Sequence, residues 1–275
     1  MDAKIKFAVF AICWNESKLM PHFLRHYRQA SRLVLMDNES TDNSVEIFLK
    51  DYQDSMNNGQ KRQVITFSTE QTLNDQTNID MKNKTWTNFV DQDMDYIMIQ
   101  DLDEFVSFPK HPHDILSGLA IFKKKSITCS YCTAYDMACS DEEFDLVTKN
   151  QFIIDVIKTG KRNKSQSPYE TYDKVLIINP HQIQDTNFIP GQHRWFPKGN
   201  VILADDEDRP LLLHYKYIGE KWETERRKLF RERMSQENLS RRFGHQYSVS
   251  DEQINQFIQN GHKNIIDLTS IIFQL

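Results

Sequence analysis

Short apolar runs alternate with segments of helical periodicity along the first hundred residues of the chain. Residues 4–12 are almost continuously apolar, and apolar positions then recur at helical spacing over 19–27. The unit repeats, because the apolar run 33–36 ends in a polar segment and is followed by a helical pattern that starts at Val45 behind capping residues. This alternation is typical of βαβ crossovers and predicts parallel strands.

Two more strands are expected at 64–67 and 96–99, separated by a polar and weakly helical region that extends through Phe89. The last of these runs leads directly into the acidic segment 101–105, Asp-Leu-Asp-Glu-Phe. We therefore predict an α/β fold with a Rossmann-like, mostly parallel central sheet flanked by helices.

The pattern is less regular after residue 110. The elements expected there are a helix at 114–122, strands at 126–133 and 174–178, a polar loop at 159–167 and, beyond the apolar run 211–214, a charged amphipathic helix that reaches residue 236. These elements extend the sheet and end the chain in a helical segment.

Length and charge limit the functional classes. The chain has 275 residues, which fits one catalytic unit of α/β size with an added C-terminal part. Its net charge of -5 argues against a nucleic-acid-binding surface over the whole molecule. No apolar run approaches the roughly 20 residues that span a bilayer, so a cytoplasmic protein is expected.

A basic stretch interrupts the acidic balance of the C-terminal part. It consists of Arg226, Arg227, Lys228, Arg231 and Arg233. Two interpretations are open: a solvated helix face, or a local contact for phosphates or for the head groups of a membrane surface.

The four cysteines favour a reducing compartment. Cys13, Cys129, Cys132 and Cys139 lie in apolar or mixed segments, and no second Cys-x-x-Cys pair completes a zinc site. A redox dithiol at Cys129 and Cys132 is the alternative to buried structural thiols, which their position on an expected strand favours.

Polar side chains are expected where the predicted strands end. Ligands of open parallel sheets bind beyond the carboxyl ends of the strands, and Asn15, Asp37 and Asp101 lie there. Asp101 and Asp103 also point to the same side, because side chains alternate along a strand. Paired carboxylates suit Mg²⁺ or Mn²⁺, which complete their coordination with water and substrate phosphates.

These motifs resemble those of the family-2-like glycosyltransferases of the GT-A fold. The resemblance rests on segments in matching order, 12–16 (Ile-Cys-Trp-Asn-Glu), 36–44 (Met-Asp-Asn-Glu-Ser-Thr-Asp-Asn-Ser), 101–105 and 214–216 (His-Tyr-Lys). It covers the first half of the chain and extends more loosely to residue 240. It implies transfer of a hexose, with inversion, from a nucleotide sugar, with UDP the expected nucleotide. The expected acceptor is a glycan, a lipid-linked sugar or a protein side chain.

The resemblance also implies roles for individual residues. A divalent cation and a lysine beside the donor diphosphate stabilise the negative charge that builds up as the sugar leaves. Carried onto this chain, the expected roles are Asn15, Glu16 and Asp37 at the base and ribose, Asp101 at the ribose and the metal, Asp103 and His214 on the metal, and Lys216 at the departing diphosphate.

An inverting transfer also requires a carboxylate base on the acceptor side. The candidates are Asp136, Asp141, Glu142 and Glu143. Asp136 is the expected base because it follows an apolar strand, whereas the other three have the composition of a solvated acidic loop.

Two further features concern the acceptor-side half. His193, Arg194 and Trp195 combine an aromatic ring with hydrogen-bond donors, which suits either sugar binding or a structural turn with a packed Trp. Lys174 precedes an expected strand and is either a basic residue of the site or an exposed residue at a strand edge. The expected divisions are a catalytic domain over 1–218, with a nucleotide-sugar half (1–110) and an acceptor half (111–218), and a helical extension over 219–275.

Three other classes are considered. A haloacid-dehalogenase-type phosphohydrolase also uses an Asp-x-Asp motif, but it has Thr or Val where this chain has Phe105, and its motif follows the first strand. A sugar nucleotidyltransferase requires a Gly-rich loop after the first strand, whereas the first glycine here is Gly59. A non-catalytic carbohydrate-binding protein of the same fold would differ by lacking turnover.

Overall fold

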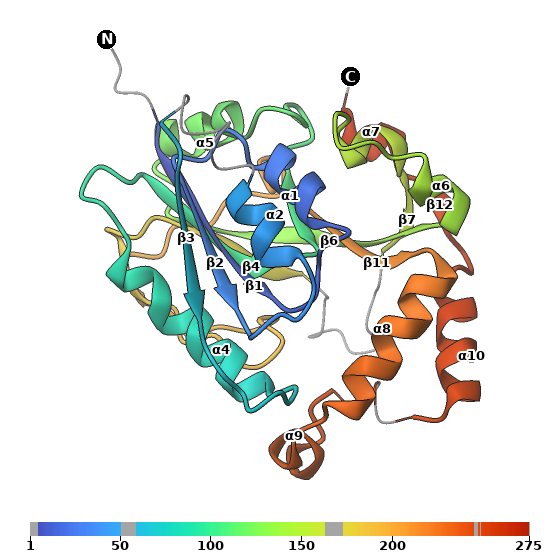
Figure 1. Cartoon of the computed structure of the whole chain (residues 1–275). Coiled ribbons are helices and arrows are strands. Elements are labelled where there is room, and N and C mark those ends of the chain that lie inside the picture. The colour runs from blue at the N-terminus through green and yellow to red at the C-terminus, as the bar shows by residue number, and fades with distance from the viewer. Residues whose placement is uncertain (1–4, 51–58, 163–172, 245–246, 248, 275) are drawn as a thin grey trace.

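The computed structural model describes residues 5–50, 59–162, 173–244, 247 and 249–274 (Figure 1). It contains a central sheet with helices on both faces and a group of helices at the C-terminal end of the chain (Figure 1). The predicted α/β fold with a mostly parallel central sheet flanked by helices is confirmed.

The first four strands form the parallel half of the sheet, in the order β3-β2-β1-β4. Their bounds are Phe7–Cys13 for β1, Arg32–Asp37 for β2, Lys61–Thr66 for β3 and Tyr96–Asp101 for β4. Asp37 pairs in register with the last residue of β1, and Asp101 pairs with the residue before it. The parallel register therefore brings the ends of β1, β2 and β4 to one edge of the sheet.

The later strands extend the sheet in mixed orientation. They are β5 (Glu104–Ser107), β6 (Cys129–Cys139), β7 (Thr159–Lys161), β8 (Lys174–Ile178), β11 (Leu211–Ile218) and β12 (Ile266–Asp267). Strand β8 joins β4 to β6 through antiparallel pairs, and β11 runs parallel to β6 and antiparallel to β5. A separate two-stranded sheet contains β9 (Ile183–Asp185) and β10 (Lys198–Gly199).

Alternating residues of β1 pack against different helices. Phe7 and Val9 belong to a core that includes Phe23 of α1 (Met20–His26), while Ala8 lies in a second core with Trp86 of the 3₁₀ helix η2 (Thr85–Asn88). The nearly continuous apolar sequence of β1 follows from this, because a strand covered on both faces has no solvated side.

The remaining helices lie in three regions. Helices α2 (Ser44–Lys50) and α4 (Asp75–Lys84) follow β2 and β3, and α5 (Ile115–Lys124), α6 (Asp141–Asp145) and α7 (Ile153–Val156) flank β6. The C-terminal helices are α8 (Glu220–Glu232), α9 (Gln236–Arg241), α10 (Asp251–Gly261) and α11 (Thr269–Ile272). Helices α8 and α10 lie side by side (Figure 1).

Three expected segments have wrong boundaries. Strand β6 begins and ends later than the expected 126–133, and β11 continues to Ile218 where the charged helix was expected. Both strands continue because the second half of β6, from Thr133 to Cys139, pairs with β11 from Leu211 to Ile218. The expected loop 159–167 begins with strand β7, which pairs with β6 and β12, and its part from residue 163 lies outside the described residues.

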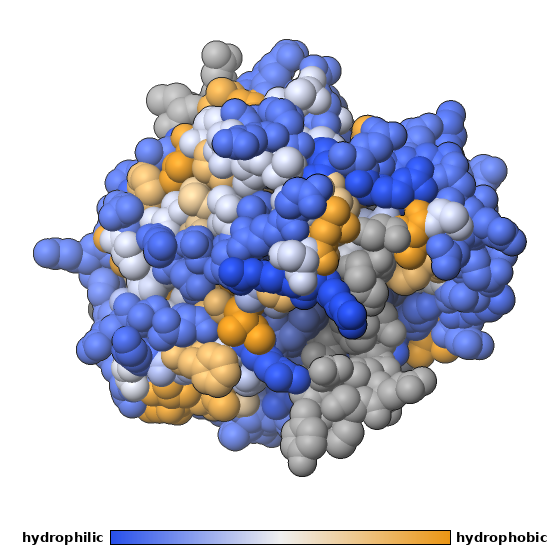
Figure 2. All heavy atoms as spheres, turned by 90° about the horizontal axis from the view of Figure 1, so that it is seen from below, coloured by the Kyte–Doolittle hydropathy of each residue, from blue (hydrophilic) through white to orange (hydrophobic). Residues whose placement is uncertain are grey.

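The surface is mainly hydrophilic. On the face shown in Figure 2, apolar residues form separate patches within a polar surface. Large exposed apolar side chains include Leu146 and Phe196, at 71% and 64% exposure. Within the described residues, no helix combines the length and the apolar character needed to cross a lipid bilayer.

The packing of α10 on β11 gives a test of this arrangement. A methyl group at Gly261 would lie 2.4 Å from the ring of Tyr217, so Gly261→Ala should lower the free energy of unfolding by about 1–3 kcal/mol. Urea denaturation measures this. Gln259→Ala, at an exposed position of the same helix, is the control and should change the stability by no more than about 0.5 kcal/mol. Equal stability of the two variants would contradict the packing.

Candidate active site

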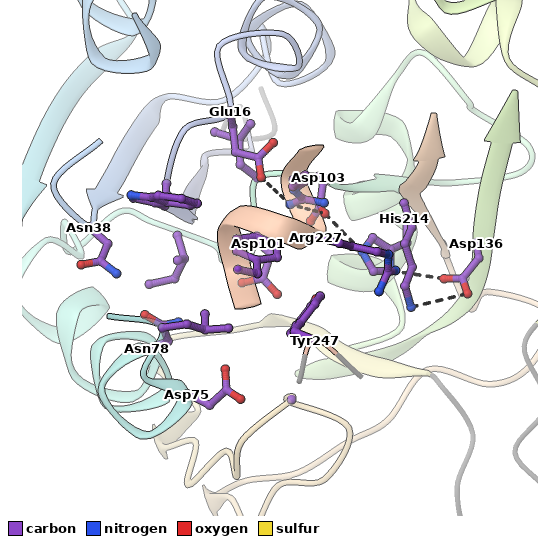
Figure 3. A pocket seen from close by; sticks show the side chains of 18 of the residues that line it. Glu16, Asn38, Asp75, Asn78, Asp101, Asp103, Asp136, His214, Arg227 and Tyr247 are labelled. Atoms are coloured by element: carbon purple, nitrogen blue, oxygen red, sulfur yellow. Dashed lines mark hydrogen bonds and ion pairs between the residues drawn. The ribbon is translucent and has the colours of Figure 1, made fainter. Parts of the chain in front are cut away.

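A cavity of about 300 Å³ lies beyond the ends of β1 and β4 and is closed on one side by α8 (Figure 3). In Figure 3, Asn38, Asn78 and Asp75 lie to one side of Asp101 and Asp103, and His214 and Asp136 lie to the other. The polar and charged residues that line it are Glu16, Asn38, Asp75, Asn78, Asp101, Asp103, Asp136, Lys174, His193, His214, Lys216, Glu223, Arg226, Arg227, Arg233 and Tyr247.

The loop after β1 is fixed by hydrogen bonds to the loop after β2. The Asn15 side-chain oxygen accepts hydrogen bonds from the backbone N–H groups of Thr41 and Asp42, at 2.7 and 3.2 Å. The Glu16 backbone N–H donates to the Ser44 hydroxyl at 2.8 Å. Asn15 therefore holds the two loops together and does not line the cavity, whereas Glu16 does.

Asp37 is buried behind the cavity wall. One carboxylate oxygen accepts a hydrogen bond from the Ser40 backbone N–H at 3.2 Å, and the other is buried without a hydrogen-bond partner in the described structure. The next residue, Asn38, lines the cavity. The end of β2 thus supplies one lining amide and one buried carboxylate.

Arg226 of α8 bridges Glu16 and Asp103. Its Nη2 contacts the carboxylate of Glu16 and lies 2.9 Å from that of Asp103. Burial acts to raise the pKa of Glu16, and the charge of Arg226 opposes this shift. Burial also acts to raise the pKa of Asp103, but Arg226 and His214 outweigh it and hold that pKa well below its usual range.

Asp101 is held by two lysines. Its carboxylate oxygens lie 2.7 Å from Lys82 Nζ and 3.4 Å from Lys174 Nζ, and Lys174 also pairs with Glu104. Burial acts to raise the pKa of Asp101, but the two lysines outweigh it and hold that pKa at about 2. Lys174 is only 7% exposed, which excludes the exposed strand-edge interpretation and makes it part of the cavity wall.

His214 lies between two carboxylates. Its Nε2 is 3.3 Å from Asp103 and its Nδ1 is 3.3 Å from Asp136, its register partner on β6. Burial acts to lower the pKa of His214, but the two carboxylates outweigh it and raise that pKa to about 9. Lys216 Nζ lies 3.9 Å from Asp136. The imidazolium and the ammonium thus share one buried carboxylate.

The 191–195 segment supplies one of its three candidate residues to the cavity. His193 lines it, and burial, with the neighbouring Lys174, lowers the pKa of His193 to about 3. Trp195 packs in a core with its ring stacked 6.2 Å from that of Phe188, and neither it nor the exposed Arg194 lines the cavity. The structural-turn interpretation therefore describes Trp195.

The remaining base candidates lie outside the cavity. Asp141, Glu142 and Glu143 form the first turn of α6, where Glu143 completes a capping box with Ser140. Among the four candidates, Asp136 lines the cavity.

The three predicted metal ligands do not converge on one point. Asp103 and His214 contact each other, whereas Asp101 is held by lysines. The imidazole nitrogens of His214 face carboxylates, and a protonated ring has no lone pair for a cation. Both oxygens of Asp101 and one oxygen of Asp103 face ammonium, imidazolium or guanidinium groups, so this arrangement does not fit a divalent ion.

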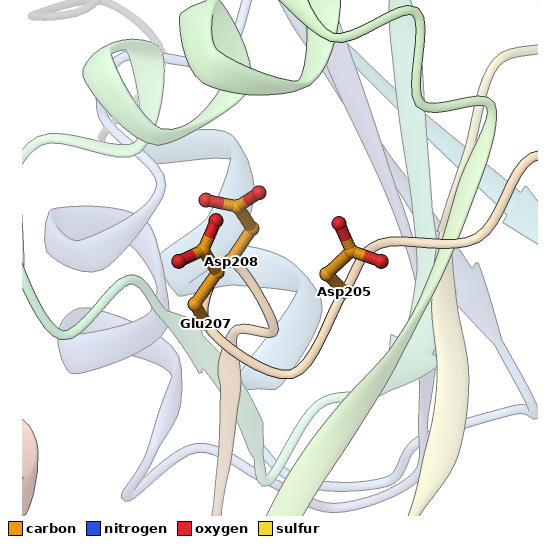
Figure 4. Close-up of side chains that lie close together, drawn as sticks. All are labelled: Asp205, Glu207 and Asp208. Atoms are coloured by element: carbon orange, nitrogen blue, oxygen red, sulfur yellow. The ribbon is translucent and has the colours of Figure 1, made fainter.

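Another acidic group lies on the surface. In the described part of the chain, Asp205, Glu207 and Asp208 are the residues that bring three potential ligand atoms within 4.8 Å of one another (Figure 4). Lys125 Nζ lies 2.9 Å from Glu207 and 2.5 Å from Asp208. The lysine balances the charge of this group, which we interpret as a surface ion-pair cluster.

Sequence reasoning missed the contribution of α8. The interpretation of the basic stretch as a solvated helix face is wrong for Arg226 and for the fully buried Arg227, because both line the cavity. The signal was the helical spacing of Trp222, Arg226 and Phe230, because an apolar residue four positions to each side places an arginine on the inward face. Asp75 was missed because its position at the start of α4 depends on a residue far along the chain. The side-chain oxygen of Asn238 accepts a hydrogen bond from the backbone N–H of Asp75.

The chain has distant structural similarity to solved enzymes, whereas no protein-family model and no curated protein matches it. UDP-glucose pyrophosphorylase in complex with UDP-glucose is 10% identical over 64% of this chain and 77% of its own, with a TM-score of 0.34. The apo form of UDP-glucose pyrophosphorylase is 9% identical over 77% of this chain and 90% of its own, with a TM-score of 0.35. The mannosyltransferase Ktr4p from S. cerevisiae is 7% identical over 51% of this chain and 41% of its own, with a TM-score of 0.27. TM-scores this low carry no argument about function.

The pKa of His214 is directly testable. Histidine-selective NMR in metal-free buffer should give a titration midpoint near 9. Because this folded-state pKa lies above the unfolded value of about 6.5, the stabilisation is complete below about pH 6.5 and is lost as the pH rises through 9. Asp136→Asn should lower the midpoint. A wild-type midpoint at or below the unfolded value would contradict the ion-pair geometry.

Proposed function

We propose that the chain is a nucleotide-sugar-dependent glycosyltransferase and that the cavity is its donor and acceptor site. The observation that carries this proposal is the position of Asp101 and Asp103, which line one cavity together with His214, Lys216 and Asp136. The first pair lies at the end of a parallel strand, where ligands of such sheets bind. The other three come from β6 and β11, on the side assigned to the acceptor.

The nucleotide is assigned to the side of the cavity formed by the loops after β1 and β2. Trp14 lines this side with the Arg233 guanidinium over its ring, 3.5 Å from the ring centroid, and Asn38 and Asn78 offer amide donors and acceptors. Asp37 lies behind this wall with a buried carboxylate oxygen that has no partner among the described residues, and the sequence resemblance assigns it to the ribose or the base. UDP is the proposed nucleotide, on the strength of the sequence resemblance.

The sugar transfer is assigned to the centre of the cavity. Breaking the bond between the anomeric carbon and the diphosphate leaves negative charge on the phosphate oxygens. Cations fixed around the cavity stabilise that charge more in the transition state than in the ground state. Lys216 and Arg226 line the cavity and are held by carboxylates, so they are in place before the charge develops.

Asp136 is the proposed base. It is 4% exposed, lines the cavity and lies on the acceptor side, where it would accept the proton of the attacking hydroxyl. His214 and Lys216 hold its carboxylate in position. They also contact the oxygens that must accept the proton, so we assign them the further role of releasing Asp136 as the donor binds.

Nucleotide binding tests the donor half of the proposal. In calorimetric titrations with Mn²⁺ present, UDP should bind more tightly than GDP or CDP. Asp37→Ala should lower the affinity for UDP by about tenfold, because the variant lacks one charge-assisted interaction. Asp145→Asn, an exposed change on α6, is the control. Absence of binding by all three nucleotides would contradict the transferase and favour a phosphohydrolase or a non-catalytic protein.

Turnover tests the assignment of Asp136. With a UDP-sugar that the wild type consumes in the presence of an acceptor, Asp136→Asn should lower kcat by about 10²- to 10⁴-fold, because a general base is lost. The affinity for UDP should change little, since Asp136 lies on the opposite side of Asp101 and Asp103 from Asn38 and Asn78, which we assign to the nucleotide (Figure 3). Wild-type kcat in this variant would remove Asp136 from the reaction, and equal losses in kcat and UDP affinity would indicate a structural role.

A further inference from the structure

Arg226 occupies a central position in the cavity wall. Its guanidinium contacts two carboxylates, those of Glu16 and Asp103, that belong to different strand ends. The rings of Trp222 and Phe230 lie on the same helix, each with its centroid 5.1 Å from the guanidinium carbon. Ion pairs and cation–π contacts therefore fix the orientation of a side chain that is only 15% exposed.

The acids of the Asp-x-Asp pair are already balanced by protein cations. One oxygen of Asp103 lies 2.9 Å from Arg226 Nη2 and 3.3 Å from His214 Nε2. The two oxygens of Asp101 face Lys82 and Lys174. A divalent cation binds by direct contact with carboxylate oxygens, and here both oxygens of Asp101 and one oxygen of Asp103 are engaged by positive groups.

Arg226 also retains hydrogen-bonding capacity. Both ion pairs use Nη2, and no described residue accepts a hydrogen bond from Nη1. Arg226 lines the cavity, together with Lys174, Lys216 and Arg233. A planar guanidinium held by carboxylates on one side and open on another matches the geometry of phosphate oxygens.

We propose that Arg226 takes the place of a divalent cation at Asp103 and binds the donor diphosphate directly. This inference rests on the proposed glycosyltransferase function and specifies its donor site. The acceptor oxygen forms the new bond to the anomeric carbon, and its proton passes to Asp136. The electron pair of the broken bond passes to the diphosphate oxygen, next to Arg226. Donor binding then needs no added metal.

Arginine is required at this position for a geometric reason. A guanidinium presents several N–H groups in one plane, so it reaches Glu16, Asp103 and a phosphate together, whereas a lysine ammonium is a point charge on a flexible stem. Loss of the side chain would expose the carboxylates of Glu16 and Asp103 to the cavity. These carboxylates would then be available to a divalent ion.

The experiment compares UDP affinity and UDP-sugar consumption with excess EDTA and with excess Mn²⁺. The UDP affinity and the rate of UDP-sugar consumption of the wild type should each differ by less than about threefold between the two conditions, because the cation at the diphosphate is the side chain of Arg226. In EDTA, Arg226→Ala should bind UDP about 10- to 100-fold more weakly, as expected for lost charge-assisted hydrogen bonds. Mn²⁺ should restore part of this loss. Arg231→Ala is the matched control and should behave as wild type, because Arg231 does not line the cavity and pairs with Asp251 of α10.

The outcomes separate this inference from the proposed function. Strictly Mn²⁺-dependent UDP binding by the wild type would overturn the role of Arg226 and leave the glycosyltransferase intact. No UDP binding in either condition would overturn both. The wild-type comparison needs no variant. If Arg226→Ala does not fold, Arg226→Lys, which keeps the charge, tests whether the guanidinium is required. Full UDP affinity of Arg226→Lys in EDTA would contradict the need for a guanidinium.

Discussion

The ion pairs of Arg226 connect the start of the chain, the Asp-x-Asp motif and the C-terminal helices. Asp103 is 4% exposed at the end of the parallel half of the sheet, and a buried carboxylate needs a fixed partner. Arg226 supplies one from more than a hundred residues away. Removing one partner of such a buried pair typically costs about 3–5 kcal/mol, because the other charge is left uncompensated. Helix α8 is therefore part of the site as well as of the C-terminal extension.

The same principle applies across the cavity. Lys82 and Lys174 hold Asp101, and His214 and Lys216 hold Asp136. Gln192 reinforces the first group, since it accepts a hydrogen bond from Lys82 and donates to the backbone of β4 and β8. Such prearranged charges favour a reaction that places negative charge in the cavity, because they need not reorganise when that charge appears.

Local patterns in the sequence predicted the parallel half of the sheet and the acids at its edge. Asp101 and Asp103 follow a buried strand, and strand alternation and register are local properties. The pairing of His214 with Asp136 depends on the parallel contact of β6 and β11, which no spacing in the sequence encodes. Trp195 was ambiguous because a packed ring and a sugar-binding ring have the same local sequence, and its stacking on Phe188 decides between them.

Anomalous diffraction from crystals grown with UDP and Mn²⁺ tests the central claim most directly. We predict density for the diphosphate within hydrogen-bonding distance of Arg226 Nη1, with Arg226 still on Asp103 and no anomalous peak between the two carboxylates Asp101 and Asp103. An anomalous peak coordinated by Asp103 and the diphosphate, with Arg226 displaced, would contradict the role of Arg226. UDP bound outside the cavity would contradict the donor site itself.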